Sequence, residues 1–243
     1  MEYEVRYRPS FSLLEVRLNA GEQITAEAGA MVYMTEGVEV KTRVRSGGLF
    51  QKIKVSMLGG ESFFVNDYIA DRPSKVGFAA APMGDIERLE VQPNRGFIIQ
   101  SGAYVASTSS VQLDTQWQGF TKGLFGTSLF MLKATGQGDV FVNTFGAMDQ
   151  HILGQGETMT VDNFHLVAFT EGCTYSVRKF GGLKSTILGG EGLVTEVAGP
   201  GEIFVQTKNP HEFASWLAAF MPRVEREGKE GVEFRVGGFR IGK

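Results

Sequence analysis

The stretch "GDVFVNTFG" at residues 138–146 decides the fold, because two similar stretches occur elsewhere in the chain. Residues 60–66 read "GESFFVN" and residues 201–207 read "GEIFVQT". Each stretch combines a glycine, an acidic residue, a Phe-Val pair and a side-chain amide. Self-similarity of this kind is typical of one supersecondary unit repeated along the chain. The sequence therefore predicts three copies of a single structural element.

Other landmarks recur in the same order in all three copies. Thr35, Thr108 and Thr170 align, each after an aligned valine, and each copy continues with a Gly-Leu step. Apolar and polar residues mostly alternate, as in "QITAEAGAMVY" and "TMTVDNFHLVAF", which is the period of half-buried strands. Paired glycines between these segments predict tight hairpin turns, because glycine adopts positive φ without strain.

These patterns predict an all-β protein of three pseudo-repeated antiparallel β-sandwich units. The units are expected to form one domain over residues 1–243, packed about a pseudo-threefold axis. Closure around such an axis would remove exposed strand edges. The expected boundaries of the units are approximately 1–85, 86–150 and 151–208.

One helix is predicted near the C-terminus, in "NPHEFASWLAAFMPRV" at 209–224. Asn209 suits the N-cap and Pro210 the first helical position. Apolar side chains follow at helical spacing, so the helix is expected to cap the β core. A partner-binding helix is the alternative. The charged tail at 225–243 is expected to add a strand, "VEFRV".

Composition limits the classes of function. The 243 residues are 42% apolar and 21% charged, as in soluble globular proteins. A net charge of −3 disfavours a dedicated nucleic-acid binder, which usually carries a basic patch. The longest uncharged run is too polar to span a membrane. The N-terminal residues do not resemble a signal peptide, so a cytoplasmic location is expected.

No catalytic or metal-binding motif is found. His151, His165 and His211 are far apart in sequence and form no ligand pair, which disfavours zinc sites and metal-dependent double-stranded β-helix enzymes. Cys173 is the single cysteine and is expected to pack in a strand as a small apolar residue. No nucleophile elbow or phosphate loop occurs. We therefore expect no enzyme activity, no cofactor and no metal.

Side-chain amides are the best polar candidates for a site. Asn66, Asn143 and Gln206 each follow the shared Phe-Val pair. They would form a ring of polar groups that binds a small molecule, or they would hydrogen-bond the loop backbone. The residue pattern favours the second role.

Apolar residues in glycine-rich hairpins are candidates for interaction. Loop tips are normally polar, so an apolar tip predicts contact with another copy, with the rest of the chain or with a membrane surface. Contact between copies is favoured. The candidate residues are Leu49, Phe50, Leu124, Phe125, Phe130 and Leu183.

Four segments carry a resemblance to a known family. "EAGAMVYMTEGVEVKTRV", "GESFFVNDY", "GFIIQSGAYVAS" and "DVFVNTFG" resemble the bacterial and archaeal proteins related to the fungal mitochondrial biogenesis protein Aim24, the Aim24 (DUF124) family. The similarity runs from about Tyr3 to Phe220. It implies β-sandwich units similar to the tryptophan-RNA-binding attenuation protein. Its mitochondrial members are implicated in organising inner-membrane complexes, and no catalytic residues are established for it.

Together these observations predict a non-enzymatic scaffold or binding protein that forms a homo-oligomer. Its apolar loops would contact protein or membrane-complex partners, without a transmembrane segment of its own. Binding of a small ligand or RNA in grooves between the repeats is the alternative, with Lys52 and Lys54 on the most basic run. Fold analogy to an RNA-binding protein is weak support for that alternative.

Overall fold

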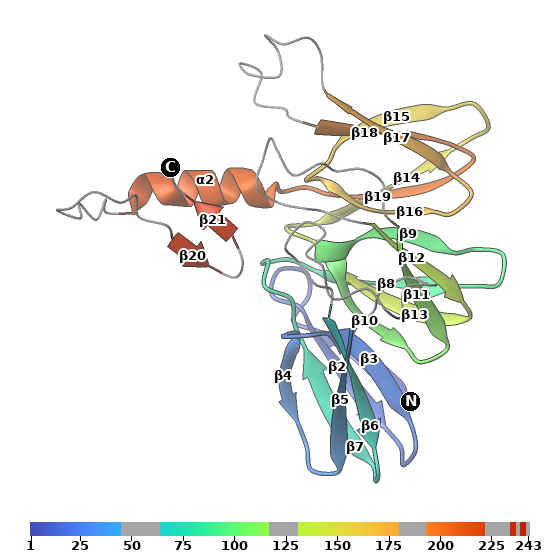
Figure 1. The fold of residues 1–243 in the computed structure, drawn as a ribbon, viewed down its shortest axis with the longest axis vertical. Coiled ribbons are helices and arrows are strands. Elements are labelled where there is room, and N and C mark those ends of the chain that lie inside the picture. Colours follow the sequence, from blue (N-terminus) through green and yellow to red (C-terminus); the bar gives the residue numbers. More distant parts are fainter. Residues whose placement is uncertain (45–63, 117–130, 180–192, 222–233, 237–238, 242–243) are drawn as a thin grey trace.

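The computed structural model describes residues 1–44, 64–116, 131–179, 193–221, 234–236 and 239–241. In this part of the chain the protein is mostly antiparallel β-sheet, with one α-helix near the C-terminus. The predicted fold class is thus confirmed. Four sheets, numbered I to IV here, are stacked one above another (Figure 1).

Sheets I and II contain the N-terminal strands. The strand order in sheet I is β1(Glu2–Arg6), β2(Leu13–Leu18), β7(Ser74–Phe78), β4(Met31–Met34). The order in sheet II is β5(Val38–Val44), β6(Phe64–Ala70), β3(Gln23–Glu27), β10(Tyr104–Thr108), β13(Gly138–Asn143), β8(Ile86–Val91). Sheet II therefore joins strands from the first and second thirds of the chain.

Sheets III and IV complete the stack. The order in sheet III is β11(Val111–Gln116), β12(Met131–Gly136), β9(Phe97–Gln100), β16(Leu166–Thr170), β19(Gly201–Gln206), β14(Met148–Leu153). The order in sheet IV is β15(Thr158–Asp162), β18(Leu193–Ala198), β17(Thr174–Lys179). A short 3₁₀ turn, Ser101–Ala103, follows β9, and β20(Phe234–Val236) pairs with β21(Phe239–Ile241).

A separate apolar core fills each space between neighbouring sheets. Leu14 and Phe78 of sheet I meet Tyr68 of sheet II, and the Tyr68 and Phe78 rings pack edge-to-face with centroids 5.0 Å apart. Other cores lie between sheets II and III and between III and IV. Burial of each large apolar side chain contributes about 1.5–3 kcal/mol, so the inner faces of the strands hold the stack together.

Strand pairing recurs three times along the chain. The orders β2-β7-β4, β8-β13-β10 and β14-β19-β16 correspond, as do β5-β6-β3, β11-β12-β9 and β17-β18-β15. A register shift also recurs at corresponding places, at Met31/Tyr33 in β4, Tyr104/Ala106 in β10 and Leu166/Ala168 in β16. The pseudo-threefold axis and the unit boundaries stay predictions.

One part of the predicted sequence alignment is wrong. Phe64-Val65 lies on β6, which pairs with β3 and β5. Phe141-Val142 and Phe204-Val205 lie on β13 and β19, whose counterpart in the first third is β7, "SKVGF". The stretch "GESFFVN" is therefore not the third copy of "GDVFVNT". The physical reason is that every buried strand has the same period of two, so an alignment can slip by one whole strand.

The expected closure of the three units is not found among the described strands. Strands β4 and β15 are end strands of sheets I and IV, which lie at opposite ends of the stack (Figure 1). Their counterparts are paired inside the chain, because β10 pairs with β3 and β16 pairs with β9. Among the described strands, the edges of β4 and β15 are therefore open, whereas the corresponding edges of the other units are paired.

The predicted helix is confirmed as α2(Pro210–Phe220), with Asn209 as its N-cap. The Asn209 side-chain oxygen accepts hydrogen bonds from the backbone N–H groups of His211 (2.9 Å) and Glu212 (3.2 Å). The expectation that this helix caps the β core is wrong. None of its residues is buried, and it projects sideways from the stack (Figure 1). It is attached by its first turn, where Phe213 packs edge-on against Phe145.

Candidate functional site

The predicted apolar loop residues cannot be placed. Leu49, Phe50, Leu124, Phe125, Phe130 and Leu183 all lie outside the described residues, as do Lys52 and Lys54. Their role stays a prediction.

The three predicted amides occupy different positions and do not form a ring. Asn143 and Gln206 end the corresponding strands β13 and β19, whereas Asn66 lies within β6, opposite Ala26 and Thr42. No hydrogen bond recorded among the described residues joins two of these amides. The predicted equivalence of Asn66 with Asn143 and Gln206 is wrong, because β6 does not correspond to β13 and β19.

Asn143 and Gln206 hydrogen-bond the backbone of neighbouring loops. Asn143 Nδ2 donates to Thr144 O at 3.2 Å. Gln206 Oε1 accepts from Phe145 N at 2.8 Å, and its Nε2 donates to Phe164 O at 2.7 Å. These are the contacts of buried amides that fix loop conformation. They occupy both amide atoms of Gln206 and the Nδ2 group of Asn143.

The aligned threonines make one recurring hydrogen bond. Thr108 Oγ1 accepts from Asp139 N at 3.0 Å, and Thr170 Oγ1 accepts from Glu202 N at 2.9 Å. Thr35 Oγ1 accepts in the same way from Lys75 N at 2.9 Å. The acidic residue of the repeated motif is thus held through its backbone. Lysine at the corresponding position in β7 shows that this hydrogen bond does not require an acid.

The glycine that precedes the acid is required by close approach. Gly138 and Gly201 have φ of +153° and +155°, and an added Cβ would lie 2.1 Å and 2.3 Å from the Oγ1 atoms of Thr108 and Thr170. No such side chain fits without movement. The Gly-Asp and Gly-Glu steps therefore serve strand geometry, which answers why "GDVFVN" and "GEIFVQ" recur.

A polar surface cleft lies between the β8–β9 and β16–β17 loops. Its volume is about 330 Å³, and its lining residues are Gln92, Asn94, Arg95, Gly96, Thr170, Glu171, Gly172 and Glu202. Arg95 donates to Glu202 at 2.7 Å, and its guanidinium lies 5.1 Å from the centroid of the Phe97 ring. The cleft offers polar contacts to a small molecule, but its arginine is already paired.

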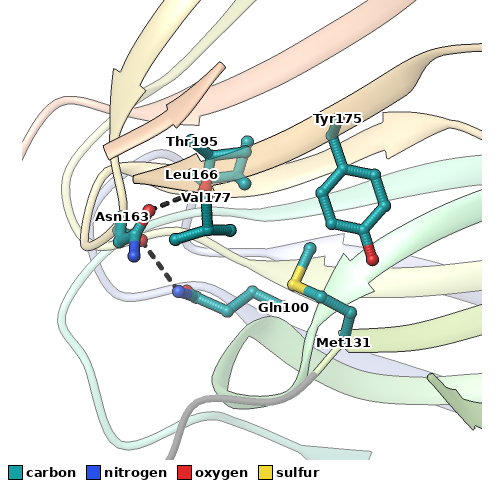
Figure 2. Close-up of a pocket in the computed structure, with 7 residues that line it drawn as sticks. All are labelled: Gln100, Met131, Asn163, Leu166, Tyr175, Val177 and Thr195. Carbon is teal, nitrogen blue, oxygen red and sulfur yellow. Dashed lines mark hydrogen bonds between the residues drawn. The ribbon is translucent and has the colours of Figure 1, made fainter. Parts of the chain in front are cut away.

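A second cavity lies between sheets III and IV (Figure 2). Gln100 Nε2 donates to Asn163 O at 2.9 Å, and Thr195 Oγ1 donates to Asn163 Oδ1 at 2.7 Å. The volume of about 10 Å³ suits about one water molecule at most. Asn163 therefore links sheets III and IV, and the cavity is too small for a ligand.

Among the described residues, no group of three or more His, Cys, Asp or Glu side chains is arranged to hold a metal ion. His151 lies 3.1 Å from Asp149, and His165 Nδ1 lies 2.7 Å from Gln206 O. Cys173 is buried as expected, but it lies in the turn before β17 rather than in a strand, so its expected strand position is wrong. Within the same part of the chain, no helix is long and apolar enough to cross a membrane.

Glu27 is a half-buried carboxyl at the end of β3. Burial raises its pKa to about 7, because a charged carboxylate is poorly solvated there. In the unfolded chain the carboxyl loses its proton near pH 4.3. The free energy of unfolding therefore falls as pH rises from about 4 to 7. This position therefore destabilises the protein at neutral and alkaline pH.

Glu27→Gln is expected to raise the free energy of unfolding at pH 8 by about 1–3 kcal/mol and to change it little at pH 4. Urea unfolding curves of the variant and the parent at both pH values measure the difference. Glu36→Gln, at an exposed position, is the matched control and should have no such pH-dependent effect. An equal effect of Glu27→Gln at both pH values would contradict the assignment.

The outer edge strand β4 exposes apolar side chains that its counterparts bury. Met31, Val32 and Met34 are 39%, 56% and 43% exposed. The residues corresponding to Met31 and Val32 are Tyr104 and Val105 on β10, and Leu166 and Val167 on β16, all of which are buried. A cluster of exposed apolar residues on a strand edge is typical of an interaction surface.

Helix α2 exposes a second apolar surface. Trp216, Leu217, Phe220 and Met221 are all exposed large hydrophobic residues. The Trp216 ring packs against both Phe213 and Phe220, with centroids 5.9 Å and 5.0 Å away. The helix therefore presents an aromatic ridge to solvent, and such ridges commonly occupy grooves on partner proteins.

Comparison with known proteins agrees with the fold. A family model described as mitochondrial biogenesis AIM24 matches residues 3–208. An uncharacterised protein of Streptococcus pyogenes serotype M6, M6_Spy0233, is 32% identical over 229 residues, covering 91% of this chain and 92% of the relative. The crystal structure of protein SPYM3_0169 from Streptococcus pyogenes superposes with a TM-score of 0.75 at 29% identity, covering 90% of this chain and 99% of that one.

Proposed function

The chain belongs to the mitochondrial biogenesis AIM24 family, and we propose that it is a non-enzymatic, self-associating scaffold. Copies associate through the exposed edge of sheet I, and helix α2 presents an apolar face to a protein partner. A cytoplasmic protein of this kind would attach to other assemblies, membrane complexes included, without spanning the bilayer itself.

The observation that carries this proposal is the exposure of Val32. Val32 is 56% exposed, whereas its counterparts Val105 and Val167 are fully buried. Val105 lies on β10, which also pairs with β3, and Val167 lies on β16, which also pairs with β9. An apolar residue at a position of this type is best explained by a surface that is covered when copies associate.

The polar groups of the described chain support a structural rather than a catalytic role. Asp139 pairs with Arg88 and Glu202 pairs with Arg95, each at 2.7 Å. Catalytic acids and bases are usually found in clefts, with pKa values shifted by burial and neighbouring charges. Here Asp139 is held in an ion pair between β8 and β13, and Glu202, although it lines the cleft beside Arg95, is held by that arginine, which favours a scaffold.

Val32→Glu is expected to lower the mass in solution to that of one chain, 26.6 kDa, because a charge at a covered apolar edge is costly to bury. Size-exclusion chromatography with light scattering measures the mass. Ile152→Glu is the matched control, because Ile152 is 77% exposed on β14 and the corresponding residue of β8 is Glu90. A variant with unchanged mass would contradict a role for β4.

Binding of a small polar molecule is a second candidate function, favoured by the cleft beside Arg95. That cleft lies between loops of the second and third units, where the sequence predicts a groove. A small molecule retained by the purified protein in native mass spectrometry would favour this alternative. RNA binding has no comparable support, because the basic run with Lys52 and Lys54 lies outside the described residues.

A further inference from the structure

We propose that β4 of one copy pairs antiparallel with β15 of a second copy, in the register that joins the units inside the chain. The proposal rests on the self-association proposed above and specifies its interface. It treats sheets I and IV as two halves of one sheet, completed only between chains.

Two junctions inside the chain define the expected geometry. At the first, β10 pairs with β3 through Ala106↔Ala26, Ser107↔Thr25 and Thr108↔Ile24. At the second, β16 pairs with β9 through Ala168↔Ile99, Phe169↔Ile98 and Thr170↔Phe97. Both junctions begin directly after the register shift in β10 or β16 and reach the recurring threonine. The unit-to-unit contact is therefore the same structure, formed twice.

Strands β4 and β15 correspond to the two strands of each internal junction, but they lie at the ends of separate sheets. Strand β4 carries the same register shift as β10 and β16, and is followed by the threonine Thr35. Strand β15 pairs with β18 as β3 pairs with β6 and β9 pairs with β12. Among the described strands, neither has a partner on its other side. Joining them would give the order β17-β18-β15-β4-β7-β2, which matches sheets II and III.

Counting from the recurring threonine fixes the register. Tyr33 corresponds to Ala106 and Ala168, and Val161 corresponds to Ala26 and Ile99. The third junction should therefore align Tyr33↔Val161, Met34↔Thr160 and Thr35↔Met159. A shift by one residue would reverse the faces on which every side chain lies, so this register is a sharp prediction.

The same junction explains the exposed Val32 of β4. At the internal junctions, the valine that corresponds to Val32 is buried against the preceding sheet, Val105 in the core between sheets I and II and Val167 in the core between sheets II and III. In a second copy, sheet III of the neighbouring chain would stand in that place. The contact is head-to-tail, because a β4 edge meets a β15 edge. Such contacts generate rings when they close, and a ring leaves neither edge open.

Cysteine cross-linking tests the register directly. In a Cys173→Val background, chosen because the corresponding residue at the start of β11 is Val111, Met34→Cys is combined with Thr160→Cys. Directly opposed residues in antiparallel strands have Cα atoms about 4.5–5.5 Å apart, within the range that a disulfide spans. Under mild oxidation we expect a ladder of linked chains on a non-reducing gel. Met34 and Thr160 are exposed and Cys173 is replaced by a residue of similar size, so the variant should fold.

The matched control moves one cysteine by two residues on the same face. Met34→Cys with Thr158→Cys places the cysteines diagonally, about 7–8 Å apart, so cross-linking should fall at least about tenfold. Each single-cysteine variant alone should stay unlinked. A mixture of the Met34→Cys and Thr160→Cys variants should give linked pairs and nothing longer.

Four outcomes would overturn the inference. Linkage of Met34→Cys alone would show that β4 pairs with β4. Equal linkage through Thr158 and Thr160 would deny the register. A multi-chain mass without linkage through Thr160 would place the interface elsewhere while the proposed scaffold stands. A single-chain mass at every concentration would remove both proposals.

Discussion

Gly84→Ala is expected to lower the free energy of unfolding by at least about 3 kcal/mol, or to prevent folding. A Cβ at this buried position would lie 1.7 Å from Thr144 O and 2.7 Å from Thr144 C. These are backbone atoms, so no side-chain rotation relieves the clash. Thr144 is itself held, because its N–H donates to Asp85 O at 2.9 Å. The β7–β8 connection and the end of β13 would have to separate.

Gly102→Ala is the matched control for this prediction. Gly102 lies in the short turn after β9, and an added Cβ would have no neighbour within 4 Å. Its stability change should stay within about 0.5 kcal/mol. Urea unfolding followed by circular dichroism measures both variants. Equal stability of the two would show that the close backbone contact at Gly84 is not maintained in solution.

Asp85→Ala is expected to lower the free energy of unfolding by about 3 kcal/mol. The buried Asp85 carboxylate accepts from Arg8 Nη2 at 2.8 Å, from Ser12 Oγ at 2.6 Å and from Ile86 N at 2.8 Å. These bonds fasten the segment between β1 and β2 to the start of β8. Removing the carboxylate leaves buried donors without partners, which costs more than the hydrogen bonds themselves contribute.

The same carboxylate should make stability depend on acid. Burial raises the pKa of Asp85, but the hydrogen bonds from Arg8, Ser12 and Ile86 together lower it below the usual value. The stabilisation is therefore complete above about pH 4, the usual pKa of an aspartate, and is lost as pH falls through the lower, folded-state value. Asp85→Asn should remove this contribution to acid sensitivity.

Asp71→Ala is the control for the Asp85 variants. Its partner Arg72 lies 2.9 Å away, but the Asp71 side chain is 66% exposed. Exposed ion pairs contribute about 0–1 kcal/mol, so the free energy of unfolding of the variant should lie within about 0.5 kcal/mol of the parent's. Comparable losses at Asp71 and Asp85 would mean that burial does not set the strength of the Asp85 contacts.

Features set by neighbouring residues could be predicted from the sequence. The helix N-cap at Asn209 was identified correctly, because capping depends on a few adjacent side chains. The all-β class followed from alternation and paired glycines. The repeated "GDVFVN" and "GEIFVQ" were matched correctly, and their glycines have one shared geometric cause. In contrast, Phe64-Val65 was assigned to the wrong strand of its unit, because period alone does not identify a strand.

Features that depend on distant pairing could not be predicted. Val32, Val105 and Val167 look equivalent in the sequence, yet Val32 alone among them is exposed. That difference arises because β10 and β16 each pair with a second strand, β3 or β9, whereas β4 pairs with β7 alone among the described strands. Helix α2 was expected to cover the core because of its apolar stripe, but the structure leaves it exposed. Its apolar stripe is evident, but the surface that covers it is not encoded locally.

The mass of the unmodified protein in solution tests self-association most directly. Light scattering behind size exclusion, over a range of about 1–100 µM chain, would report it. A mass that is an integral multiple of 26.6 kDa, and that falls to one chain in Val32→Glu but not in Ile152→Glu, is the predicted result. A mass of one chain at every concentration would contradict the scaffold, and the edges of β4 and β15 would then need another explanation.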